Sequence, residues 1–199
     1  MRTTKPTPRQ SIYGLFAGLL LLLSGCITAT VGVIAVTSVD IAKDDRTFGT
    51  LIDDNVIEAN IFKDIVTDPA LDGNTHINST VVNGVVLLTG EVASNEQKFR
   101  AAQIANAYQG VDQVVNQLEV LGKTSMTSRT NDTLITAKVK TEFIRDKGID
   151  SSDIKVVTER GIVYLLGIVT PAEGEAAVNL AKQVGGVVRI VKIFMSHAG

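Results

Sequence analysis

The sequence predicts an α+β fold made of two tandem helix–strand–strand–helix–strand (αββαβ) units, each a small three-stranded sheet packed against two helices. The main observation is an internal repeat: "NGVVLLTGEV" (residues 83–92) returns as "RGIVYLLGIV" (residues 160–169), and similar helical patterns flank both stretches. Each copy has about 65 residues, a length at which a lone hydrophobic core is marginal. We therefore expect the two copies to pack on each other.

The first helix of each copy is predicted from apolar residues spaced four apart, which places them on one helical face. An aspartate, Asp54 or Asp132, stands just before each run, as a helix N-cap does. The pair Asp53-Asp54 is accordingly interpreted as capping, and not as catalytic carboxylates. The predicted core stripes are Ile57, Ile61 and Ile65 in the first copy and Ile135, Val139 and Phe143 in the second.

Two strands and a second helix follow in each copy. Asn83-Gly84 and Arg160-Gly161 stand between strand-like runs and predict tight hairpin turns, in which both central residues need positive φ. The second helices are rich in alanine, and small residues let a helix lie close to a sheet. Pro171 stands near the first turn of the last helix, where its missing N–H costs nothing. A final strand closes each copy.

The first 25 residues predict a cleaved lipoprotein signal peptide. A basic start is followed by an apolar run, residues 12–23, that is too short to cross a bilayer as a helix. The run ends in "LSGC", which resembles the lipobox of bacterial lipoproteins, so Cys26 is the predicted lipid anchor. The alternative is an ordinary signal peptide with a chance cysteine. By resemblance to bacterial sorting patterns, Ile27 favours the outer membrane, with the protein facing the periplasm.

The remaining chain divides into an acylated N-terminus and tether (26–50), a first domain (51–121), a linker (122–130) and a second domain (131–199). We interpret the apolar tether as a segment lying along the folded body or close to the bilayer. Without residues 1–25 the chain loses three of its 19 Lys and Arg residues, which leaves 16 against 21 Asp and Glu, a net charge of −5. This balance argues against nucleic acid as a partner.

The sequence does not predict an enzyme, a cofactor or a metal site. It has two histidines, His76 in a predicted strand start and His197 in the C-terminal tail. No Cys or His cluster has metal-ligand spacing, and there is no phosphate-binding loop.

The αββαβ unit, the paired-glycine hairpins and the ending "GVDQVVNQL" resemble the BON-domain family. The stretches "RTFGTLIDD" and "TNDTLITAKVKTEF" are similar to those of its dual-BON outer-membrane lipoproteins. This resemblance implies a protein that binds anionic phospholipid through the first helix of its second BON domain. It also implies a role in envelope integrity and presence at division sites.

Four of the predicted lipid-facing residues lie on one stripe of that helix, away from its core face, and Ile144 flanks this stripe. Apolar side chains there can enter the headgroup boundary while cations meet phosphates. The alternative is that this face packs on the other domain. The predicted phospholipid-binding residues are Leu134, Lys138, Thr141, Ile144 and Arg145.

The first copy serves as an internal comparison, because its matching stripe is Val56, Asn60, Lys63 and Thr67. Residues 53–65 hold four acids and one base, a net charge of −3, whereas residues 131–147 hold four bases and three acids, a net charge of +1. Each cation near an anionic surface contributes about 1 kcal/mol of attraction. The sequence thus predicts that the second copy faces lipid. The first copy could instead dock an envelope protein partner, which makes a periplasmic adaptor the alternative function.

Overall fold

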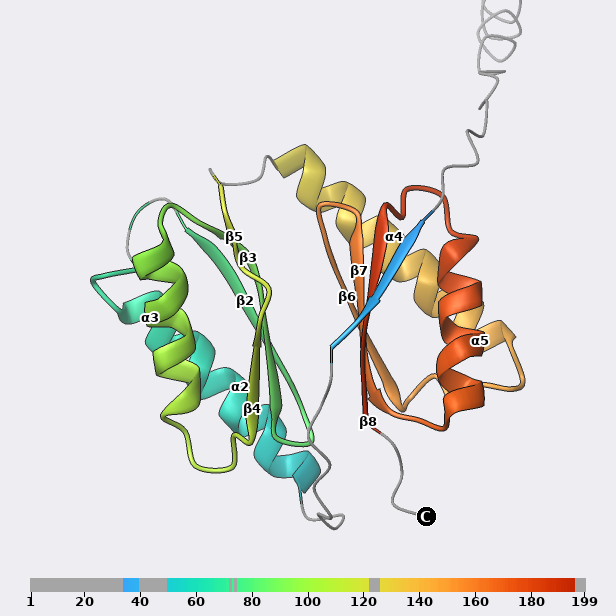
Figure 1. Ribbon diagram of the computed structural model, residues 1–199, viewed down its shortest axis with the longest axis horizontal. Helices are drawn as coiled ribbons and strands as arrows, with labels where there is room; N and C mark the ends of the chain where they lie inside the picture. Colours follow the sequence, from blue (N-terminus) through green and yellow to red (C-terminus); the bar gives the residue numbers. More distant parts are fainter. Residues whose placement is uncertain (1–33, 40–49, 72, 74, 122–125, 196–199) are drawn as a thin grey trace, which may run out of the picture. The chain divides into compact units, whose positions relative to one another are not determined.

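The computed structural model describes residues 34–39, 50–71, 73, 75–121 and 126–195 (Figure 1). The amino-terminal half comprises β1 (Ala35–Ser38), α2 (Thr50–Thr67), β2 (His76–Val82), β3 (Val85–Val92), α3 (Asn95–Asn106), β4 (Gln113–Asn116) and β5 (Glu119–Val120). The carboxyl-terminal half comprises α4 (Met126–Arg145), β6 (Ile154–Glu159), β7 (Ile162–Ile168), α5 (Pro171–Lys182) and β8 (Arg189–Met195).

Each half folds into the predicted αββαβ unit. In the first domain the strand order is β2-β3-β4, and β5 also pairs with β3; α2 and α3 cover one face of this sheet. In the second domain the order is β1-β8-β7-β6, and α4 and α5 cover one face. The α+β fold is confirmed with two differences: the last strand of the first domain is divided into β4 and β5, and the second sheet has four strands.

The other faces of the two sheets pack against each other. Apolar side chains of β3 and β4 meet those of β7 and β8 in a shared buried cluster, and Tyr164 is among its largest fully buried members. This contact confirms that the copies pack together. The first-domain members are Val85, Leu87 and Val115; those of the second domain are Ile162, Tyr164, Leu166, Val191 and Ile193.

The hairpin turns form as predicted. Asn83 and Arg160 have φ values of 50° and 52°, and the glycine after each also has positive φ. The second glycine of each repeat, Gly90 or Gly167, lies where two backbones approach closely, and Gly90 also has positive φ. A Cβ there would overlap the carbonyl oxygen of His76 in β2 or of Asp153 just before β6. The repeated glycine pair therefore serves a turn and a close approach of backbones.

The predicted capping role of Asp54 and Asp132 is wrong. Helix α2 begins at Thr50 and α4 at Met126, so both aspartates lie inside a helix, on its buried side. The Asp132 carboxylate accepts hydrogen bonds from the backbone N–H groups of Arg160 (2.9 Å) and Gly161 (2.8 Å). Asp54 accepts the equivalent pair from the first hairpin turn, at 2.6 and 3.0 Å. Each aspartate ties its helix to the turn of the same domain.

Two predicted connecting segments contain secondary structure. Helix α4 begins within the predicted linker 122–130, because the polar residues there include no glycine or proline after Gly122 to stop a helix. Strand β1 lies within the predicted tether 26–50 and pairs in parallel with β8. The predicted signal peptide and Cys26 lie outside the described residues.

The close approach at the second glycine predicts a position-specific stability loss. Gly167→Ala is expected to lower the free energy of unfolding by about 1–3 kcal/mol, because the new methyl group must displace the backbone of β6. Gly185→Ala is the matched control, since a Cβ at Gly185 meets nothing within 4 Å. Urea denaturation followed by circular dichroism measures both; equal losses would contradict the steric account.

The helix-to-turn hydrogen bonds predict a second effect. Asp132→Asn keeps the shape of the side chain but turns an NH₂ group toward a backbone N–H, so one bond of the pair is lost at a buried site. We expect a loss of about 1–3 kcal/mol in the free energy of unfolding.

Asp54→Asn should behave alike, whereas Asp153→Asn, at an exposed position, should change stability by no more than about 0.5 kcal/mol. Thermal melts in which all three variants lose the same stability would refute the proposed role of these hydrogen bonds.

Candidate functional site

Helix α4 is held on the second sheet by one apolar face and by polar contacts that include the Asp132 carboxylate. Ile135, Val139 and Phe143 are buried against β6, β7 and α5. The hydroxyl of Thr136 donates to that of Thr158 on β6 at 2.7 Å. The buried stripe predicted from the four-residue spacing is therefore confirmed, and it fixes which side of α4 points away from the sheet.

The predicted lipid-facing residues all lie on the outward side of α4. Leu134 is 54% exposed and Ile144 is 72% exposed, and both are among the large apolar side chains that the fold leaves in solvent. Lys138, Thr141 and Arg145 are also exposed. The first domain does not cover this face, because it packs on the opposite face of the second sheet. The structure thus removes the alternative that these residues contact the first domain.

One cation of this face was missed by the sequence analysis. Lys140 is exposed and stands four residues before Ile144, so the two are neighbours on the helix surface. It lies on the side of Ile144 away from Lys138, so cations flank the apolar residues on both sides. The signal was present in the spacing, but the stripe was drawn through Leu134. We call Leu134, Lys138, Lys140, Thr141, Ile144 and Arg145 the outward face of α4.

Arg145 forms an ion pair with a residue of the same helix. Its guanidinium lies 2.9 Å from a carboxylate oxygen of Glu142, and the Arg145 side chain stays 70% exposed. Exposed ion pairs of this kind contribute only about 0–1 kcal/mol. The pair therefore orients the arginine while leaving it able to exchange this carboxylate for a phosphate. The hydroxyl of Thr141 donates to the carbonyl of Ala137 within the helix, at 2.8 Å.

The first domain shows that exposed apolar residues alone do not mark the site. Helix α2 also presents large apolar side chains to solvent, and Val56, the counterpart of Leu134, is 55% exposed; the others are Phe62 and Val66. Charge separates the two helices. Helix α2 holds four acids and one base, a net charge of −3, whereas α4 holds four bases and two acids, a net charge of +2. An anionic surface therefore favours α4.

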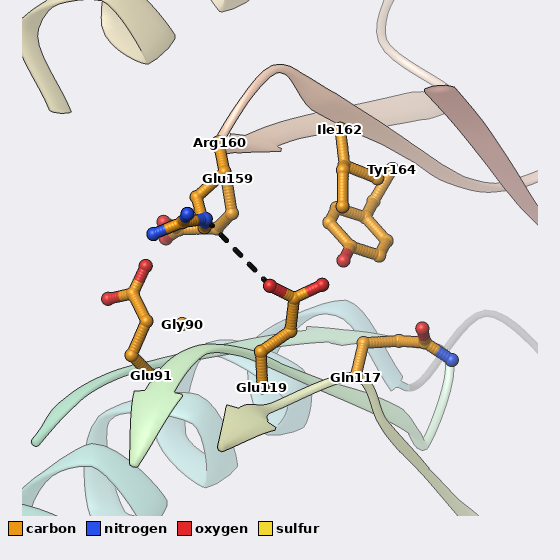
Figure 2. A pocket seen from close by; sticks show the side chains of 8 residues that line it. All are labelled: Gly90, Glu91, Gln117, Glu119, Glu159, Arg160, Ile162 and Tyr164. Atoms are coloured by element: carbon orange, nitrogen blue, oxygen red, sulfur yellow. Dashed lines mark ion pairs between the residues drawn. The ribbon is translucent and has the colours of Figure 1, made fainter. Parts of the chain in front are cut away.

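A small pocket lies where the two sheets meet at the hairpin end of β6 and β7 (Figure 2). Glu119 from the first domain points toward Arg160 across it, with a closest separation of 3.8 Å, and its other carboxylate oxygen lies 4.0 Å from Arg189. The pocket thus holds charges that already pair between domains. The ion pairs of Glu119 thus link the first domain to the second at this pocket.

Glu159 is a buried carboxylate at this interface. Its carboxylate is buried, accepts a hydrogen bond from the Asn78 amide at 2.6 Å and lies 3.8 Å from Nε2 of His76. Burial raises the Glu159 pKa to about 7, and nearby Glu91 and Asp132 add to the rise, whereas Asn78 and Arg129 oppose it. Glu159 therefore changes charge near neutral pH.

Within the part of the chain that the structure describes, no group of three or more His, Cys, Asp and Glu side chains could hold a metal ion. No helix found there has the length and apolar character needed to cross a bilayer. His76 lies at the start of β2 as predicted, and His197 falls outside the described residues.

The family follows from comparison of the whole sequence with family models. The BON domain model matches twice, at residues 53–122 and 131–193. The chain belongs to the BON-domain family. The two matches coincide with the two αββαβ units, so the repeat seen in the sequence is a repeat of BON domains.

Several relatives match this chain over most of its length. The outer membrane lipoprotein DolP of Haemophilus influenzae is 34% identical over 89% of this chain and 91% of its own length. A 21 kDa hemolysin of Actinobacillus pleuropneumoniae is 30% identical over 75% of this chain and 77% of its own length. Osmotically-inducible protein Y of Escherichia coli is 32% identical over 70% of both chains.

The buried Glu159 predicts a pH dependence of stability. Because its pKa is raised in the folded state, its contribution is fully present below about pH 4.5 and is lost as the pH rises through about 7. Glu159→Gln removes the ionisation but keeps an oxygen that can accept from Asn78. The variant should therefore gain stability relative to the parent at pH 8, by up to about 3 kcal/mol, and little at pH 5.

Urea denaturation of both proteins at pH 5 and pH 8 measures this difference. His76→Gln serves as the control for the neighbouring imidazole, which lies 3.8 Å from the Glu159 carboxylate. A stability difference between Glu159→Gln and the parent that is the same at both pH values would refute the assignment.

Proposed function

We propose that this protein is an outer-membrane lipoprotein, anchored through Cys26 and facing the periplasm, that binds anionic phospholipid through the outward face of α4. The relation to the outer membrane lipoprotein DolP supports the location. The lipobox-like "LSGC" supports the anchor. A role in envelope integrity, and presence at division sites, belong to the same proposal and rest on the family resemblance.

The single observation that carries the lipid proposal is the composition of the uncovered face of α4. It presents two large apolar side chains flanked by cations, and no described residue of the first domain lies against it. Apolar groups can enter the headgroup boundary while Lys and Arg reach phosphates beside them. Lys138, Lys140 and Arg145 together supply about 3 kcal/mol of attraction to an anionic surface at roughly 1 kcal/mol each.

Liposome binding tests this proposal directly. The mature chain (residues 26–199) carrying Cys26→Ser, which removes the anchor, is expected to co-sediment with phosphatidylglycerol-containing vesicles and to dissociate as salt is added. Leu134→Glu and the double variant Lys138→Glu, Arg145→Glu should each bind at least about tenfold more weakly, since 1.4 kcal/mol is a factor of ten.

Val56→Glu is the matched control. It introduces the same charge at the equivalent position and nearly equal exposure on the first domain, and it should bind like the parent. No binding by the parent, or equal loss for Val56→Glu and Leu134→Glu, would overturn the lipid assignment to α4.

The second candidate function is a protein-interaction adaptor. The exposed apolar side chains of α2, together with its net charge of −3, favour a protein partner over an anionic bilayer. The two functions use different helices. An adaptor would lose partner recruitment on changes at Phe62 and Val66, with vesicle binding unchanged.

A further inference from the structure

The amino-terminal segment of the chain pairs with the second domain, although it directly precedes the first. Strand β1 runs parallel to β8 from the pair Ala35 and Arg189 to the pair Ser38 and Lys192. The backbone N–H of Val39 extends the ladder to the carbonyl of Lys192 at 2.9 Å. Ile34 and Val36 pack against the core of the second domain. The edge of β8 is thus filled by residues more than 150 positions earlier.

The geometry points to a tether with a function: by docking on β8, β1 holds the second domain, and with it α4, close to the membrane anchor. This inference rests on the proposed anchor at Cys26. Eight residues, 27–34, separate Cys26 from β1. Even fully extended, they span no more than about 30 Å.

Without β1 docking, the chain segment between Cys26 and the folded domains would be much longer. The chain would be free from residue 27 to residue 49, the 23 residues before α2 begins at Thr50, and would reach up to about 80 Å. A shorter segment between Cys26 and the second domain raises the effective concentration of α4 at the bilayer, since contact of α4 with lipid becomes intramolecular once the chain is anchored.

The exit point of the tether agrees with the position of α4. Ala35, at the anchor side of β1, is in register with Arg189, which is in register with Ile162 at the start of β7. The turn just before Ile162 is the one bound by Asp132 of α4. The tether therefore leaves the second sheet at the end where the amino-terminal half of α4 is attached, as the blue β1 ribbon and α4 in Figure 1 indicate.

Docking is tested by a disulfide across the ladder. Ser38→Cys with Lys192→Cys places two cysteines in register on neighbouring strands, which lie about 4.8 Å apart and within disulfide reach. In the full-length chain in bacterial membranes, mild oxidation should give a monomer whose new thiols resist maleimide. Ser38→Cys with Asn60→Cys, on exposed α2, should stay reactive. Absence of the first disulfide, or a disulfide between two molecules, would overturn docking within one chain.

The claim that β1 docking keeps α4 close to the bilayer is tested by the distance from α4 to lipid. A fluorophore on Asn131→Cys is measured in the anchored protein in phosphatidylcholine vesicles with nitroxide-labelled headgroups, where attraction to anionic lipid is absent. The N–H of Val39 points to β8, so by strand alternation that of Thr37 does too and that of Ser38 does not. Thr37→Pro should therefore lose most of the quenching, and Ser38→Pro, the matched control, should keep it.

Equal quenching in the parent, Thr37→Pro and Ser38→Pro would overturn the claim that β1 docking keeps α4 close to the bilayer. Because these vesicles are neutral, that result is separate from a failure of phosphatidylglycerol binding, which tests the function of α4 itself.

Discussion

The contact between the two sheets is the constraint on which the rest of this molecule depends. Each BON domain alone has one sheet with helices on one side, and its other face, with residues such as Leu87 or Tyr164, would be left in water. Packing the two faces together buries both. Apolar burial contributes about 25 cal/mol per Å², so two units that are marginal alone become one stable body. The helices are thereby forced to the outside.

This arrangement leaves the two copies with the same fold and with outward helices of different charge. Both first helices are tied to their hairpins by the same aspartate device, and both expose apolar residues on the outward side. What differs is charge, which neither core packing nor hairpin geometry constrains. The outward residues of α4 can therefore be basic around Leu134 and Ile144 while α2 is acidic. The repeat thus presents two outward helices whose surfaces differ while their core stripes match.

Much of the fold follows from local patterns in the sequence. Some patterns depend only on residues close in the sequence, so each could be interpreted alone. Examples are the four-residue spacing of Ile135, Val139 and Phe143 and the turn residues Asn83-Gly84. The role of Asp132 could not. An aspartate before an apolar run looks the same whether it caps the helix or accepts from a turn 28 residues later. Only the fold reveals which donors lie beside it.

The interactions that sequence analysis missed are those between distant segments. β1 is four residues long, and its sequence "AVTS" does not predict that it pairs with β8. The meeting of Glu159 with Asn78 and His76 likewise needs the domain contact before it exists. The outward face of α4 lies between these cases, because its spacing predicts a common face but not whether that face is covered.

The position of β1 bears on why the proposed lipid-binding helix is in the second copy. An anchor that precedes the first domain would by itself bring the first domain nearest to the bilayer, where the acidic α2 would be repelled by anionic lipid. Pairing of β1 with β8 reverses this order, since the chain contacts the second domain before it enters the first. With the proposed anchor at Cys26, four residues of strand thereby change which domain is next to the anchor. The net charges of −3 on α2 and +2 on α4 are consistent with that order, because the basic helix belongs to the domain whose tether is shortest.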